Sequence, residues 1–174
     1  MNHFDKIYEI AADNYGLVTA AQVREMGISK SELRRWVEGN RLERRGRGVY
    51  KLTKYAPTQL DRYAEAVALV GEDSFLVGEA VLAMHNLALV NPRRLGVGTP
   101  KRVRKILPEW IELVTTEGKT TTYYEGIPSQ TITEAILDCR GRVLTERLLS
   151  AAGEAREEGL ISNADLETLK KELR

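Results

Sequence analysis

The chain has 174 residues and a formal net charge of +1, and hydrophobic residues make up 43% of it. This length suits one domain or two small ones, and the apolar share is large enough for an ordinary buried core. A single cysteine, Cys139, excludes an intramolecular disulfide and fits a reducing compartment. No uncharged stretch approaches 18 residues, and no basic region precedes an apolar core at the start of the chain. We therefore expect a cytoplasmic protein without a transmembrane helix or signal peptide.

Three helical patterns open the chain. Apolar residues recur at helical spacing over residues 3–15, which predicts an amphipathic helix. A second helix is expected over residues 20–26, because Thr19 is a good N-cap. A third helix begins after Ser29, and Glu32 three residues later completes a capping box. The last two patterns are separated by a short turn, as in a helix-turn-helix.

A basic hairpin follows the third helix. Residues 41–44 and 48–52 carry strand-type residues, and residues 45–47 connect them. Gly46 and Gly48 permit positive φ at the tip of the hairpin. Two helices followed by such a hairpin have the layout of a winged helix-turn-helix.

The chain changes character at Tyr55-Ala56-Pro57, which predicts a domain boundary. We expect a winged helix-turn-helix DNA-binding domain over residues 1–55 and a mixed α/β domain over residues 56–174, so the fold class is α+β. In the second domain the periodicity predicts helices over residues 58–70, 78–87, 133–139, 143–158 and 163–173 and strands over residues 95–103 and 111–116. Residues 75–77 form a short apolar run, and residues 123–128 have the pattern of a strand followed by a turn.

Cations gather on the third helix and the hairpin, since residues 1–55 hold eleven Lys and Arg against seven Asp and Glu. The N-terminal residues of a recognition helix face the major groove, where Arg34 could pair with guanine O6 and N7. Arg45 and Arg47 lie at the hairpin tip, where a contact with phosphate or the minor groove is natural. The alternative is a solvated helix face and a charged, protected edge strand. The candidate DNA-binding residues are Thr19, Ser29, Lys30, Ser31, Arg34, Arg35, Arg41, Arg44, Arg45 and Arg47.

A second basic patch lies within residues 93–105, which hold six cations and no acid. It could be a further DNA contact, a docking surface for an acidic partner such as RNA, or a solvated loop. Its members are Arg93, Arg94, Lys101, Arg102, Arg104 and Lys105.

Catalytic signals are weak. No metalloprotease, nucleophile-elbow, phosphate-loop or paired-cysteine motif occurs. His3 lies at the terminus and His85 in an apolar helix, where a core histidine is more common than a ligand. Glu134 and Asp138 are four residues apart and could belong to a degenerate nuclease site, but no further ligands are placed beside them. We expect no enzyme activity, no catalytic residue, no cofactor and no metal.

Three segments resemble the AbiEi-type antitoxins and transcriptional regulators of type IV, abortive-infection toxin–antitoxin systems. They are LVTAAQVREMGISKSELRRWVEGNRLERRGRGVYKL, FLVGEAVLAMHNL at residues 75–87 and EGIPSQTITEAILDC at residues 125–139. The resemblance implies an N-terminal winged helix that represses its own operon at inverted repeats. It also implies a C-terminal antitoxin domain and a functional link to a nucleotidyltransferase-like toxin.

The sequence therefore favours a sequence-specific, non-enzymatic DNA-binding autorepressor and antitoxin that acts in phage defence. Its expected partner is double-stranded operator DNA, with no membrane partner, and the protein is expected to be a monomer or weak dimer in solution. The alternative is a winged-helix module that docks an acidic protein partner without binding DNA.

Overall fold

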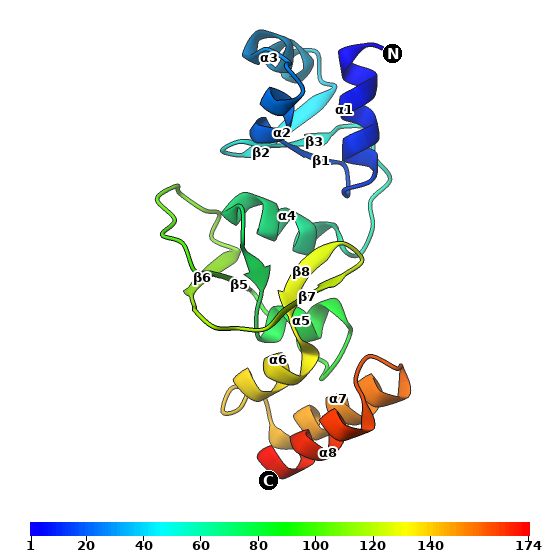
Figure 1. Cartoon of the computed structure of the whole chain (residues 1–174), viewed down its shortest axis with the longest axis vertical. Helices are drawn as coiled ribbons and strands as arrows, with labels where there is room; N and C mark the ends of the chain where they lie inside the picture. Colours follow the sequence, from blue (N-terminus) through cyan, green and yellow to red (C-terminus); the bar gives the residue numbers. More distant parts are fainter. The chain divides into compact units, whose positions relative to one another are not determined.

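The computed structural model describes residues 1–174, which form an α+β protein with helices and two sheets (Figure 1). The chain divides into two compact units. The first comprises Met1–Glu72 and Val103–Leu107, and the second comprises Asp73–Arg102 and Pro108–Arg174. No helix is both long and apolar enough to cross a membrane.

The first unit alternates short helices with a small sheet. Its elements are α1 (His3–Ala12), β1 (Leu17–Thr19), α2 (Ala20–Glu25), α3 (Lys30–Glu38), β2 (Leu42–Gly46), β3 (Val49–Leu52) and α4 (Asp61–Val70). The strands form an antiparallel sheet in the order β1-β3-β2. This arrangement is compatible with a winged helix-turn-helix.

Local capping explains where these helices begin. Asn2, Thr19 and Ser29 each form a capping box at the start of α1, α2 and α3, so the first free backbone N–H groups are satisfied. The first helix ends at Ala12, earlier than the predicted residue 15, because Tyr15 has a φ of 56° and leaves the helical conformation.

The apolar faces of α1, α2 and α3 meet one face of this sheet and close a core. Ile7 of α1 and Val18 of β1 are fully buried, and Leu42 of β2 is almost so. Burial of such side chains is the main source of folding free energy. The buried residues of this core are Ile7, Ala11, Val18, Val23, Ile28, Leu33, Trp36, Leu42 and Leu52.

Helix α4 belongs with the first unit, which extends past the boundary expected after residue 55. Lys51 of β3 donates a hydrogen bond to Asp61 of α4 at 3.2 Å. Gly46 lies so close to Leu69 that a Cβ on the glycine would collide with the leucine side chain. Gly46 has no positive φ, so of the two tip glycines only Gly48, at 73°, has the predicted left-handed conformation.

The second unit is a five-stranded sheet with four helices. Its elements are β4 (Phe75–Leu76), α5 (Glu79–Met84), β5 (Leu95–Thr99), β6 (Ile111–Thr115), β7 (Thr121–Tyr124), β8 (Ile127–Gln130), α6 (Ile132–Asp138), α7 (Thr145–Glu157) and α8 (Asn163–Glu172). The strand order is β6-β5-β4-β8-β7, with the β5–β6 and β4–β8 pairs parallel and the others antiparallel. Helices α7 and α8 pack against each other, and α6 packs against both.

Several element boundaries differ from those predicted. Strand β5 ends at Thr99 rather than residue 103, since Pro100 cannot continue a sheet ladder. Ile127–Gln130 is a separate strand, β8, where a turn was expected. Strand β1 was missed because three residues are too few to show an alternating pattern.

Candidate functional site

Helix α3 presents a polar, cationic face. Its N-terminus is held by Ser29, whose Oγ accepts a hydrogen bond from the Glu32 backbone N–H at 3.2 Å. Leu33 and Trp36 are buried in the core, which fixes the rotation of the helix. The side chains left exposed are those of Lys30, Ser31, Arg34, Arg35 and Glu38.

The cations on this face have no carboxylate within 4 Å. The one acidic side chain in the first turn, Glu32, is turned toward His3, with Oε1 2.9 Å from His3 Nδ1. This hydrogen bond lowers the pKa of Glu32. The contact gives His3 a structural role that sequence reasoning did not assign. Arg34 and Arg35 form no ion pair within 4 Å, although the charge of Arg35 also helps to lower the pKa of Glu32.

The two faces of the β2–β3 hairpin carry different cations. Arg44 is paired across the strands with Tyr50, which packs against the core beneath α1–α3. Cross-strand neighbours share one face of a sheet, so Arg44 lies on the same side of the sheet as α3. The register shifts between Arg44 and Gly46, which makes Arg45 the extra residue of a β-bulge.

Arg45 departs from the expectation of a free wing-tip cation. Its Nε donates a short hydrogen bond to Glu65 of α4, and its Nη1 lies 3.3 Å from Glu43. The hydrogen bond with Glu65 raises the pKa of Arg45. Arg47 at the tip is exposed and has no such partner.

Three other predicted site residues also serve the fold. The guanidinium carbon of Arg41 lies 3.4 Å from the centroid of the Phe4 ring, a cation–π contact that ties the hairpin to α1. Thr19 Oγ1 accepts a hydrogen bond from the Gln22 N–H at 3.2 Å. Thr19 and Ser29 thus cap their own helices, and the Thr19 hydroxyl also donates a hydrogen bond to Gln22 Oε1 at 3.3 Å.

The second basic patch is divided between the two units. Arg94 donates hydrogen bonds to the carbonyl oxygens of Glu109 and Ile111 at 3.0 and 3.1 Å. Lys101 Nζ lies 2.8 Å from Asp73. Arg94 and Lys101 therefore already have partners within the second unit. Arg93 and Arg102 belong to the same unit and are exposed.

Arg104 and Lys105 lie instead in the first unit, within Val103–Leu107. Together with the hairpin they form the walls of an open hollow of about 570 Å³. The residues that line it are Arg44, Arg45, Gly46, Arg47, Arg104, Lys105 and Ile106. Sequence reasoning placed both cations in one patch with Arg93 and did not foresee that they join the wing.

The cations of α3 and of the hairpin lie in a segment that matches a family model, whereas Arg104 and Lys105 lie outside it. Residues 5–53 match the model of a family described as transcriptional regulators, the AbiEi antitoxins. The match runs from α1 to the end of the β2–β3 hairpin, so the resemblance inferred from the first sequence segment is confirmed there. The AbiEi family comprises transcriptional regulators that act as antitoxins. A search of curated proteins found no match.

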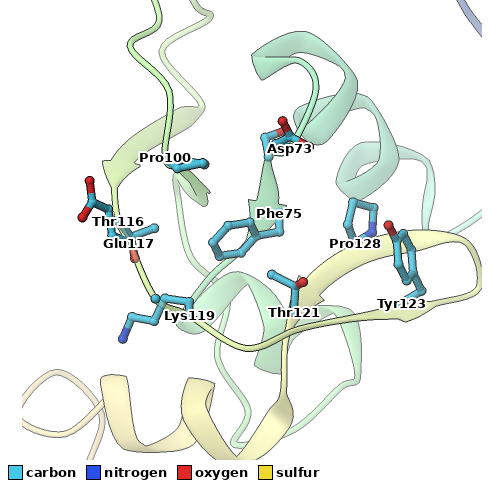
Figure 2. Close-up of a pocket in the computed structure, with 11 residues that line it drawn as sticks. Asp73, Phe75, Pro100, Thr116, Glu117, Lys119, Thr121, Tyr123 and Pro128 are labelled. Atoms are coloured by element: carbon cyan, nitrogen blue, oxygen red, sulfur yellow. The ribbon is translucent and has the colours of Figure 1, made fainter.

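The AbiEi-type segment does not include the second unit, which carries a hollow of about 280 Å³ lined by residues in or next to all five strands of its sheet. Figure 2 shows the Phe75 ring at the centre of this hollow, with Pro100, Thr121 and Pro128 around it. Tyr123 on its rim is 75% exposed. The lining combines the rings of Phe75, Pro100 and Pro128 with the charged residues Asp73, Glu117 and Lys119. Sequence reasoning did not single it out.

Glu134 and Asp138 are held by neighbouring groups. Glu134 accepts a hydrogen bond from the Thr120 N–H at 3.3 Å, and Asp138 accepts one from the Gln130 amide at 2.7 Å. Lys119 Nζ lies 3.2 Å from Asp138. No group of three His, Cys, Asp or Glu side chains converges in a way that could hold a metal ion.

His85 and Cys139 are both buried in the second unit. Burial lowers the pKa of His85 to about 4, so the imidazole is neutral at neutral pH. Burial also raises the pKa of Cys139 to about 12, with the negative charges of Glu79 and Asp138 acting in the same direction. The thiol is therefore not a nucleophile in the folded chain.

Proposed function

We propose that the first unit is a winged helix-turn-helix that binds duplex DNA, with α3 in the major groove and the β2–β3 hairpin as the wing. The observation that carries this proposal is the exposed face of α3, whose cations have no carboxylate within 4 Å and lie in a segment that matches AbiEi regulators. Such cations neutralise DNA phosphates and release condensed counterions.

The residues take different roles on the DNA. Arg34 reads guanine edges, and Lys30, Ser31 and Arg35 contact bases or the adjoining phosphates. Arg44 and Arg47 of the wing contact the backbone. Arg45 holds the hairpin to α4 through Glu65, which supports a structural role for it.

We further propose that the protein represses its own operon and acts as the antitoxin of a type IV toxin–antitoxin system in phage defence. The match to AbiEi regulators supports this role. Inverted repeats in the operator would bring together two protomers that are monomeric or weakly dimeric in solution. The chain from residue 56 onward would supply the antitoxin function against a nucleotidyltransferase-like toxin, without catalysis of its own.

A gel-shift titration with DNA from upstream of the gene tests the DNA-binding proposal. The wild-type chain is expected to bind this DNA more tightly than a scrambled duplex of the same length and composition. The same experiment with Arg34→Ala is expected to reduce that preference. Equal affinity for both duplexes at every salt concentration, or no binding at low salt, would contradict the proposal.

A stable complex with an acidic protein, combined with an absence of DNA binding, would favour the alternative of a protein-docking module. Size-exclusion chromatography of the chain with its neighbouring gene product separates the two outcomes. In that case the exposed cations of α3 would form the protein interface.

A further inference from the structure

Four cations from distant parts of the sequence meet around one hollow of the first unit. Arg44 and Arg47 come from the hairpin, and Arg104 and Lys105 come from the segment Val103–Leu107, more than fifty residues later. None of the four has a carboxylate within 4 Å. The fifth cation of the hollow, Arg45, is already neutralised by Glu43 and Glu65.

This arrangement opposes folding when no anion is present. Lys105 is half-buried, and burial together with the charge of Arg47 lowers its pKa. A lysine with a lowered pKa is one whose charged form is less stable in the folded chain than in water. A bound anion would stabilise the charged form of Lys105 and offset this cost.

The geometry favours an extended anion over a small one. The hollow is open, and its cations are supplied by two separate walls, the hairpin and the later segment. Arg44 is both a cation of the hollow and a side chain on the α3 side of the sheet, so one extended anion could engage Arg44 and the face of α3 together. A duplex presents a closely spaced row of phosphates that can serve several cations at once.

We infer that Val103–Leu107 is a second DNA-contacting segment, which with the wing clamps the phosphodiester backbone of the duplex beside α3. This inference rests on the proposed function and assigns it two further residues, Arg104 and Lys105. Of the six cations in the second basic patch, the structure thus selects these two.

The double variant Arg104→Ala/Lys105→Ala tests the inference in the full-length chain. Each lost phosphate contact lowers the slope of log affinity against log salt by about 0.9, so the slope is expected to fall by about 1.8 per protomer. At about 0.1 M salt this corresponds to an affinity loss on the order of tens of fold, shared by operator and scrambled DNA. The variant's melting temperature is expected to be no lower than that of the wild type, because like charges are removed.

Two control variants accompany this one: the first removes the same charge elsewhere, and the second keeps the charge in place. Lys6→Ala/Arg62→Ala removes one lysine and one arginine that are exposed on α1 and α4 and do not line the hollow, so its salt slope should equal that of the wild type. Arg104→Lys/Lys105→Arg keeps both charges and should retain most of the slope.

The outcomes separate this inference from the proposed function. If the wild type does not bind DNA, both are wrong. If it binds but Arg104→Ala/Lys105→Ala has the wild-type slope, only the clamp is overturned. Equal competition by an RNA duplex of the same sequence would also overturn it, because the anion would then not be specific to DNA.

Discussion

The two compact units use their cations differently. On the first unit, Arg34, Arg47 and Arg104 have no carboxylate within 4 Å, whereas on the second unit Lys101 and Lys119 each face an aspartate at 2.8 and 3.2 Å. A cation with an intramolecular partner has already been neutralised, and binding an external anion would require that contact to be broken. Charge density along the sequence therefore locates a binding surface less well than the partners of each charge do.

The largest expected effect concerns the interior of the second unit. His85 has a folded-state pKa of about 4 against an ordinary 6.5, so its protonation opposes folding. Its contribution to the free energy of unfolding is fully present above about pH 6.5 and is lost as the pH falls toward 4, by roughly 3 kcal/mol. Urea unfolding at a series of pH values measures this loss.

His85→Phe is the matched variant, since an aromatic ring can keep the stacking on Tyr124, whose ring centroid lies 4.2 Å from that of His85. It should remove most of the pH dependence between 6.5 and 4. His3→Ala, at the exposed terminus, should retain it. Parallel pH profiles for the wild type and His85→Phe would show that the imidazole is not the group responsible.

Arg45, like Lys51, is a cation of the first unit that has an acidic partner, as Lys101 and Lys119 do in the second unit. Arg45→Met leaves Glu65, whose side chain is only 8% exposed, without its main cation. We expect the free energy of unfolding to fall by about 1–3 kcal/mol, with Glu65→Gln in the same background recovering part of it. Denaturant-induced unfolding of the wild type and of both variants measures these free energies.

The comparison with Arg47→Ala makes this prediction sharper. Arg47 is exposed and has no acidic partner, so its loss should weaken DNA binding and leave stability within about 0.5 kcal/mol. If Arg45→Met instead preserves stability and weakens binding to all DNA sequences, Arg45 is a DNA contact and not a fold contact.

Arg34 is expected to determine sequence preference. Arg34→Ala should lose about 1–3 kcal/mol of discrimination between operator and scrambled DNA, which is about 5- to 150-fold in relative affinity. Lys54→Ala is the control, because Lys54 is exposed but lies beyond the hairpin. Fluorescence anisotropy with both duplexes measures the ratio, and an unchanged ratio for Arg34→Ala would remove Arg34 from the reading face.

The smallest expected effect concerns Cys139, whose thiol should hardly react in the folded chain. Cys139 is buried with a pKa raised to about 12, so the native chain should react with a thiol reagent such as DTNB only as fast as it unfolds. Adding denaturant should release one thiol per chain. A rapid reaction of the native protein at neutral pH would mean that the second unit opens around α6.

Local signals made much of the first unit predictable. Thr19 and Ser29 are N-caps whose side chains act within three residues, so the start of α2 and α3 could be read from the sequence alone. The positive φ of Gly48 lies at the predicted hairpin tip. Exposure of Arg34 followed from the burial of its neighbours Leu33 and Trp36.

The rest depends on contacts between distant residues. Nothing near Arg45 in the sequence indicates that Glu65, twenty residues later, neutralises it. Likewise, the return of Val103–Leu107 to the first unit separates Arg104 from Arg102, although the two are near neighbours in the chain. The predicted boundary after residue 55 could not take into account the packing of α4 on the sheet, for the same reason.

An NMR titration of the ¹⁵N-labelled full-length protein with operator duplex tests the central claim most directly. Amide shifts are expected to concentrate in Lys30–Arg35, in the tip of the hairpin at residues 44–48 and in Val103–Leu107, and to be small in α7 and α8. Shifts confined to the second unit, with α3 and the hairpin unchanged, would contradict the account.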